Sequence, residues 1–215
     1  MRRLIVALIV GLSLIGCATK PDREIALERK SFYWPEPKGW DNRSFEFPLY
    51  LSSEVKHEGH EELRLTPGFF KQGSPELWSY AFGWWLKDDR PLNIETLSED
   101  LVTYYRGLCA VDGPKTLKLD PARYRARVTL DPSAHATPLM KNLNYQAFLA
   151  EVDSYECLSE KTVGAPLVLQ FRVKTFRCGE QNRNVALFAI SPKPNSDPIW
   201  TALDNLVNQF RCGNQ

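Results

Sequence analysis

Residues 77–86 read LWSYAFGWWL and show the clearest two-residue alternation in the chain. Alternate side chains of a strand point to the same face, so this stretch would carry large groups on one face and small groups on the other. The large face comprises Trp78, Tyr80, Phe82 and Trp84, and the small face comprises Ser79, Ala81 and Gly83. We predict a central strand whose large face fills a core and whose small face lets another element approach closely.

The neighbouring segments predict two more strands and a helix. Residues 45–51 contain Pro48 and suit an edge strand, and residues 62–65 suit a short strand that stops at a Thr-Pro-Gly turn. After the aromatic run, Ile94–Cys109 has apolar residues at helical spacing, and its Thr96-x-x-Glu99 pattern resembles a capping box.

The second half of the chain predicts further strands and a final helix. Asp197 as N-cap with Pro198 at the first helical position favours a helix whose apolar stripe needs a sheet beneath it. We therefore expect an α+β fold, with an antiparallel β-sheet of about six or seven strands and two packed helices. If both helices share one face, the small face of residues 77–86 is the expected one. The additional strands are predicted at residues 122–130, 143–155, 166–177 and 184–190.

The first seventeen residues read MRRLIVALIVGLSLIGC, in which two arginines precede an apolar run from Leu4 to Ile15. This run is shorter than the roughly 20 residues that span a bilayer, so the pattern predicts a secretory signal. Its end, Leu14-Ile15-Gly16-Cys17, resembles the lipobox of bacterial lipoproteins. The resemblance implies cleavage before Cys17, a diacylglycerol thioether on Cys17 and acylation of the new amino group. The alternative is an ordinary signal peptide in which Cys17 has no role.

This interpretation defines the expected organisation and location. Ala18 stands where lipoproteins retained in the inner membrane often carry Asp, which favours the outer membrane, facing the periplasm. Trp34 and Trp40 are expected to dock a tether on the domain. The predicted parts are a cleaved signal peptide (1–16), a lipidated N-terminus and tether (17–44), and a single globular α+β domain (45–215).

Besides Cys17 the chain has four cysteines, which favour two disulfides in an exported protein, with free buried thiols as the alternative. Cys157 and Cys178 flank the strand at 166–177, and about twelve residues at ~3.3 Å hold them roughly 40 Å apart, too far to bond to each other. A final helix running back along the sheet would deliver Cys212 to the Cys178 end. We therefore predict the pairs Cys178–Cys212 and Cys109–Cys157.

Composition narrows the range of partners. Without residues 1–16, which hold two arginines, the 215-residue chain keeps 199 residues with 25 basic and 26 acidic ones, a net charge of about −1. A chain without basic excess gives no electrostatic case for nucleic acid. Its 43% hydrophobic and 12% aromatic content suits a globular core. The sequence predicts no cofactor, and the lack of CxxC pairs argues against a zinc site.

The segment His57-Glu58-Gly59-His60-Glu61-Glu62 is the first candidate for a metal site. Its two histidines are three residues apart in a stretch without helical pattern, and the third histidine of the chain, His135, lies in a proline-flanked loop. We predict a solvated loop for residues 57–62, with metal binding as the alternative.

No GxSxG motif or glycine-rich phosphate loop indicates catalysis. Residues 62–109 resemble exported bacterial domains, but this likeness implies no activity. We expect a non-catalytic binding or structural module of the envelope whose partner is a protein, glycan or lipid. The alternative is an envelope hydrolase with a dispersed active site.

Two sets of residues are candidates for a ligand-binding surface, although each also has a structural interpretation. The aromatic residues Trp78, Tyr80, Trp84 and Trp85 could form a ligand face, although a role in the core is preferred. Three arginines on one face of the strand at 122–130 are expected to be its solvated side, with an acidic ligand as the alternative: Arg123, Arg125 and Arg127.

Overall fold

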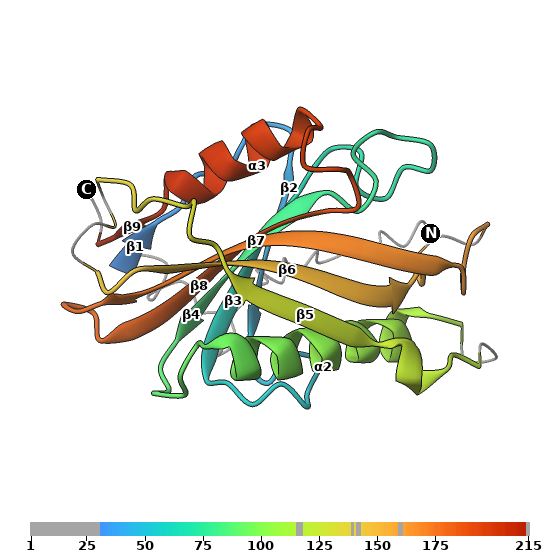
Figure 1. Cartoon of the computed structure of the whole chain (residues 1–215), viewed down its shortest axis with the longest axis horizontal. Coiled ribbons are helices and arrows are strands. Elements are labelled where there is room, and N and C mark those ends of the chain that lie inside the picture. The colour runs from blue at the N-terminus through green and yellow to red at the C-terminus, as the bar shows by residue number, and fades with distance from the viewer. Residues whose placement is uncertain (1–30, 115–117, 139, 141–142, 159–160, 214–215) are drawn as a thin grey trace, which may run out of the picture.

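The computed structural model describes residues 31–114, 118–138, 140, 143–158 and 161–213, which form an antiparallel sheet with helices packed on it (Figure 1). Seven strands lie in the order β2-β3-β4-β8-β7-β6-β5. A second, two-stranded sheet pairs β1 (Phe32–Tyr33) with β9 (Arg211–Cys212), and the α-helices are α2 (Ile94–Asp112) and α3 (Ile199–Asn208). The α+β class predicted from the sequence is confirmed. The seven strands are β2 (Asp41–Glu46), β3 (Gly59–Leu65), β4 (Tyr80–Leu86), β5 (Arg125–Leu130), β6 (Gln146–Tyr155), β7 (Pro166–Cys178) and β8 (Arg183–Ser191).

The large sheet consists of two meanders, β2-β3-β4 and β5-β6-β7-β8, that meet where β4 pairs with β8. At this junction Phe82 lies opposite Phe188, with ring centroids 4.2 Å apart. The aromatic run at 77–86 therefore lies inside the sheet, as predicted. The strand begins later than expected, at Tyr80, because Trp78 has a φ of 59° and belongs to the preceding turn.

The two helices cover opposite faces of the sheet (Figure 1). On one face Tyr104 of α2 stacks on Phe82 at 5.3 Å, and on the other Leu203 of α3 packs in a cluster with Ala81 and Leu187. The two helices therefore do not share one face, and α3 is the helix on the small-residue side of β4. β4 is buried along its whole length and β8 is buried from Val185 to Ser191, so both faces of these strands need cover.

Both helices start slightly differently from the sequence prediction. The capping box of α2 joins Asn93 and Thr96, whereas Thr96 and Glu99 were expected. The N-cap of α3 is Pro198, and the preceding Asp197 accepts a hydrogen bond from the backbone N–H of Ile199.

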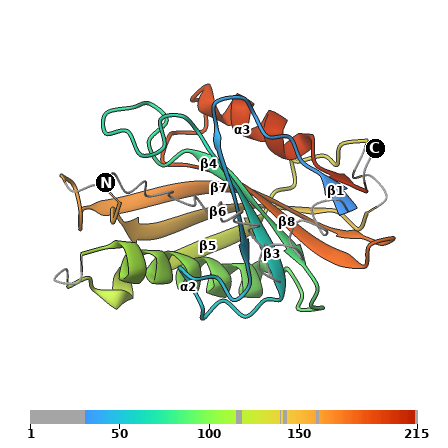
Figure 2. The ribbon, with the colours of Figure 1, turned by 180° about the vertical axis from the view of Figure 1, so that it is seen from behind.

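The segment before β2 belongs to the fold. Phe32 and Trp34 are 5% exposed, and the indole N–H of Trp34 donates to the carbonyl of Leu206 at 3.0 Å. A Cβ on Gly83 would lie 3.3 Å from the Trp34 ring, so the small residues of β4 leave room for Trp34 to pack on this face. The strand β1 of the same segment lies near α3 (Figure 2). Trp34 thus docks on the domain, as expected, and the described part of the predicted tether over 17–44 contributes β1 and the first residues of β2. Its residues 17–30 lie outside the described residues.

The first strand of the sheet also differs from the prediction. The edge strand β2 covers residues 41–46 and pairs with β3, whereas residues 45–51 were expected. Phe47, Leu49 and Pro48 follow the strand, where Leu49 forms an isolated bridge with Ser52.

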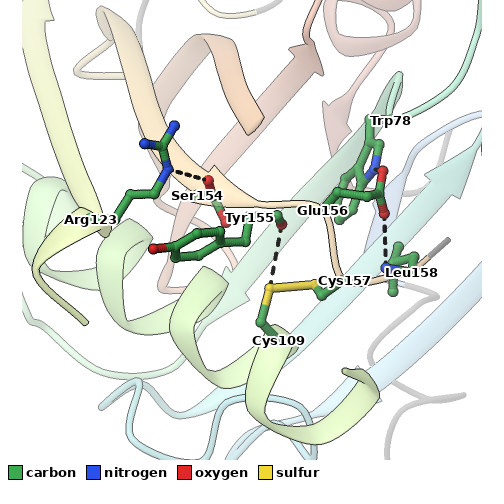
Figure 3. Close-up of a disulfide and its surroundings, with 8 residues drawn as sticks. All are labelled: Trp78, Cys109, Arg123, Ser154, Tyr155, Glu156, Cys157 and Leu158. Atoms are coloured by element: carbon green, nitrogen blue, oxygen red, sulfur yellow. Dashed lines mark hydrogen bonds between the residues drawn. A yellow bond between two sulfur atoms is a disulfide. The ribbon is translucent and has the colours of Figure 1, made fainter. Parts of the chain in front are cut away.

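Both predicted cysteine pairs are disulfides in the structure. Cys109 near the end of α2 bonds to Cys157 just after β6, with Cα atoms 5.3 Å apart (Figure 3). Cys178 at the end of β7 bonds to Cys212 in β9, with Cα atoms 5.6 Å apart. The first bridge ties α2 to the chain after β6, and the second ties β9, which follows α3, to the end of β7.

Candidate functional site

Two groups of polar side chains deserve comparison as candidate sites: a buried one around β3 and an open one beside α3. The first contradicts the prediction of a solvated loop at 57–62. His57 is 5% exposed, and His60, Glu61 and Glu62 are 1–2% exposed. The last three belong to β3, between β2 and β4, where neighbouring strands and both faces exclude water. We call His57, Glu61, Glu62 and Arg64, with their direct partners, the β3 network.

His57 is held at both ring nitrogens. Its Nδ1 lies 3.2 Å from both carboxylate oxygens of Asp88, and its Nε2 lies 3.0 Å from Oδ2 of Asp100. Arg90 donates to the other oxygen of Asp100 at 2.7 Å. Each ring nitrogen of His57 therefore faces a carboxylate, which accepts hydrogen bonds. With both nitrogens engaged, the ring has no free position for a metal or substrate.

Glu61 lies on the face of β3 that α2 covers. Its carboxylate accepts hydrogen bonds from the indole N–H of Trp84 at 2.9 Å and from the hydroxyl of Tyr104 at 3.2 Å. Burial raises the pKa of Glu61 from 4.5 to about 7, and these two donors offset part of the rise. Glu61 is therefore a buried carboxyl group whose charge changes near neutral pH.

Glu62 and Arg64 lie on the opposite face of β3. The guanidinium of Arg64 donates to Glu62 at 3.0 Å and packs over the ring of Trp34 at 4.8 Å. Glu62 also accepts a hydrogen bond from Ser44. Both charged groups are at most 2% exposed, so this pair is an internal contact of the fold. Glu61, Glu62 and Arg64 are paired and at most 2% exposed, which is typical of a structural role.

The second group lines an open cavity of about 450 Å³ beside α3, which we call the α3 cleft. α3 contacts β8 and β4, whereas β5 and β6 are contacted by α2 on the other face. In Figure 1, α3 lies across one face of the sheet. The cleft is lined by residues of β6, β7 and α3 and of the loops at 131–135 and 195. Its polar lining residues are Asp131, Ser133, His135, Arg172, Lys174, Asn195, Asp204 and Asn208.

Arg172 and Lys174 project from β7 toward α3. Arg172 pairs with Asp204 of α3, and its guanidinium packs over Trp200 at 4.5 Å. The ammonium of Lys174 donates to the side-chain amide of Asn208 and lies 6.0 Å from the ring of Tyr145. Partial burial lowers the pKa of Lys174, while Asp204 and Asp131 act in the opposite direction.

The loop after β5 supplies the other wall of the cleft. Asp131 accepts hydrogen bonds from the backbone N–H and the hydroxyl of Ser133, which fix the loop at its start. His135 is exposed on this wall, so of the three histidines it is the one that faces solvent beside a cavity. The cleft combines two cations, two carboxylates and two amides around an open space, an arrangement suited to a small polar ligand.

The aromatic residues considered as a ligand face are all in the core. Trp78, Tyr80, Trp84 and Trp85 are 0–3% exposed, so the idea of an aromatic platform is wrong. Trp78 donates its indole N–H to Glu156 at 2.6 Å beside the Cys109–Cys157 disulfide (Figure 3). The aromatic face of β4 packs against α2, where Tyr104 contacts Phe82 and Trp84.

The arginines at 123–127 lie mainly at the surface, as expected. Arg125 and Arg127 are exposed in β5, and Arg127 forms ion pairs with Glu151 and Asp153. Arg123 is half-buried and donates to the carbonyl of Ser154 (Figure 3). The acidic neighbours of Arg127 reduce the positive charge that this face could offer an anion.

The described part of the chain contains no group of three His, Cys, Asp or Glu side chains placed to hold a metal ion. Within the same residues, no helix has the length and apolar character needed to cross a membrane. The lipid attachment residue expected from the sequence, Cys17, lies outside the described ranges. A Ser-x-x-Lys spacing, which the sequence interpretation took to be absent, occurs at Ser53–Lys56 in the turn before β3, with both side chains exposed.

Comparison of the chain with protein-family models, curated proteins and solved structures finds no match. The candidate site must therefore be judged from its own chemistry. Sequence reasoning missed Arg172 and Lys174, although their alternation with Phe171 and Val173 was a usable signal. It indicated that one face of β7 is apolar while the other carries charge.

Proposed function

We propose that the chain is a lipid-anchored envelope protein that acts as a non-catalytic binding module. In this proposal Cys17 carries the lipid, and the domain is held at a bacterial membrane, with the outer membrane, facing the periplasm, favoured by Ala18. The observation that carries the proposal is the pairing of the four other cysteines into two disulfides, in a chain that begins with a lipobox-like sequence. Disulfides persist in oxidising compartments outside the cytosol, so the two features are consistent with each other.

The α3 cleft supports a binding role. Its volume of about 450 Å³ falls in the range of about 300–1,000 Å³ that is typical of small-molecule sites. Its charged and amide side chains come from β7, α3 and the loops at 131–135 and 195, and a core does not require them there. A protein, glycan or lipid of the envelope is the expected partner class.

Intact mass of the full chain purified from membranes, before and after reduction, tests the anchor and the disulfides. We expect the mass of residues 17–215 plus acyl chains. Reduction should add roughly 4 Da, because each of the two disulfides takes up two hydrogens. An unacylated chain would contradict the lipid anchor, and no gain on reduction would contradict the oxidised state.

Two variants make this measurement specific. The Cys17→Ser variant should lack the acyl mass while still gaining roughly 4 Da on reduction. The double variant Cys109→Ser/Cys157→Ser is the matched control, which should keep the acyl mass and gain roughly 2 Da. Acylation that survives Cys17→Ser would contradict the assignment of the lipid to Cys17.

A further inference from the structure

Among the described residues that line the α3 cleft, Lys174 is a cation with no carboxylate as a direct partner. Arg172 is already engaged by Asp204, with which it forms an ion pair, and by the ring of Trp200. Lys174 differs, because the one hydrogen-bond partner that the structure describes for it is the neutral amide of Asn208. An ammonium group has three donors, so Lys174 can donate to a ligand without giving up Asn208.

The surroundings of Lys174 favour a ligand with a single negative charge. A half-buried ammonium loses part of its hydration. An anion in the cleft would compensate for this loss with a charge-assisted hydrogen bond. Asp131 and Asp204 line the same cavity and would repel additional negative charge. A carboxylate carries one charge, whereas a phosphate monoester carries up to two at neutral pH and prefers several cations. A carboxylate therefore fits this cleft better than a phosphate.

The rest of the lining suits hydroxyl groups. Asp131, Asn195 and Asn208 offer carboxylate and amide oxygens that accept hydrogen bonds from hydroxyls, and the amides also donate. The floor between these walls is formed by Ala147 and Leu149 of β6, which present an apolar surface to the carbon skeleton of a ligand. A volume of about 450 Å³ is sufficient for one or two sugar rings.

We propose that the α3 cleft binds a small hydroxylated carboxylic acid of the sugar-acid class, with the ligand carboxylate on the ammonium of Lys174. The hydroxyl groups bind the amides and carboxylates of α3 and of the loops at 131–135 and 195. This inference rests on the proposed binding function and names its ligand class. It makes Lys174 the residue that distinguishes an acidic sugar from a neutral one.

Isothermal titration calorimetry on the full, purified chain tests this assignment, with glucuronate as the probe. Glucose is the neutral control and glucose 6-phosphate the phosphate control. We expect saturable binding of glucuronate and at least tenfold weaker binding of both controls. Glucose lacks the carboxylate and so loses a hydrogen bond to the charged ammonium. The additional negative charge of glucose 6-phosphate is repelled by the carboxylates of the cleft. Absence of glucuronate binding, or equal binding of glucose, would overturn the proposal. Tighter binding of glucose 6-phosphate would overturn the choice of a carboxylate.

Two lysine variants assign the effect to the cleft. Lys174→Met keeps most of the side chain but removes the charge, and it should weaken glucuronate binding at least tenfold. Lys71→Met removes an exposed lysine of the loop between β3 and β4, which does not line the cleft, and should bind like the parent chain. Equal affinity of the two variants would contradict the role of Lys174.

A measurement on the unaltered chain guards against a variant that fails to fold. In ¹H–¹⁵N NMR spectra, glucuronate should shift the backbone signals of Arg172, Lys174, Asp204 and Asn208 more than those of β3. Shifts confined to another surface would overturn the site. Binding and intact mass are separate measurements. Absence of glucuronate binding would not affect the result on the lipid anchor, and absence of acylation would not affect the result on binding.

Discussion

The β3 network and the α3 cleft use the same kinds of side chain in opposite surroundings. In the β3 network Arg64 is 1% exposed and is held by Glu62, the carbonyl of Pro35 and the ring of Trp34. In the α3 cleft Lys174 is half-buried beside an open cavity, and its described hydrogen-bond partner is a neutral amide. One cation completes an internal contact, while the other keeps donors available for a molecule from solution.

This difference shows why burial of charge alone does not identify a functional site. A buried ion pair is expensive to desolvate, and removing one partner leaves the other uncompensated. Such a pair indicates function when an open space adjoins it. Glu61, Glu62 and Arg64 of the β3 network are at most 2% exposed, whereas the α3 cleft has both charge and space, which is the reason for placing the ligand there.

Replacing the buried cation with an apolar side chain should give the largest effect. Arg64→Met would leave Glu62 buried with Ser44 and a distant His60, whose Nε2 is 3.7 Å from the carboxylate. We expect a loss of about 3–5 kcal/mol in the free energy of unfolding, the usual cost of breaking a buried ion pair. Urea denaturation followed by tryptophan fluorescence measures it.

The control for this change is Arg106→Met. Arg106 pairs with Glu54 at the surface, where the side chains are 47% and 71% exposed. Exposed pairs contribute about 0–1 kcal/mol, so its urea midpoint should stay near that of the parent chain. A comparable loss in both variants would show that the buried pair has no special role.

The pH dependence of stability should reveal Glu61. Its pKa is raised from 4.5 to about 7 in the folded chain, so the folded state binds more protons than the unfolded state between these values. The stabilisation is fully present below pH 4.5 and is lost as the pH rises through about 7. Each pKa unit corresponds to ~1.4 kcal/mol, so the loss is on the order of 3 kcal/mol.

Glu61→Gln tests this directly, because an amide does not titrate. The variant can still accept a hydrogen bond from Trp84, and its stability should lack the decrease between pH 4.5 and 7 that Glu61 causes. Unfolding at several pH values, with both chains in the same buffers, measures the difference. A parallel pH profile of the two chains would show that Glu61 does not titrate in this range.

Much of the fold was predictable from local patterns. The alternation at 77–86 predicted a strand inside the sheet, and the placement of Cys178 and Cys212 at the ends of neighbouring elements predicted their disulfide. Whether the helices share a face could not be predicted, because local periodicity shows which face of an element is apolar but not which other element covers it.

The candidate sites were harder to predict for a physical reason. Residues 60–62 are polar on both faces of β3, so the hydrophobic pattern indicated a loop. Their burial is stable because hydrogen-bond partners from α2, β2 and β4 compensate for the loss of water. The α3 cleft combines residues from 131 to 208, whose proximity depends on strand order and on which strands α3 leaves uncovered. Such long-range contacts leave no local trace in the sequence.

The smallest expected effect on stability comes from the cleft. Lys174→Met, like Arg64→Met, replaces a cation with an apolar side chain. The ammonium that it removes has a pKa lowered by burial, and its described hydrogen-bond partner is a neutral amide. We expect the free energy of unfolding to stay within about 0.5 kcal/mol of the parent chain or to rise slightly, since a partly desolvated charge is removed. The same variant should lose most of its affinity for glucuronate. A loss of stability as large as that of Arg64→Met would mean that Lys174 holds the fold together, and the contrast between a closed network and an open binding cleft would then fail.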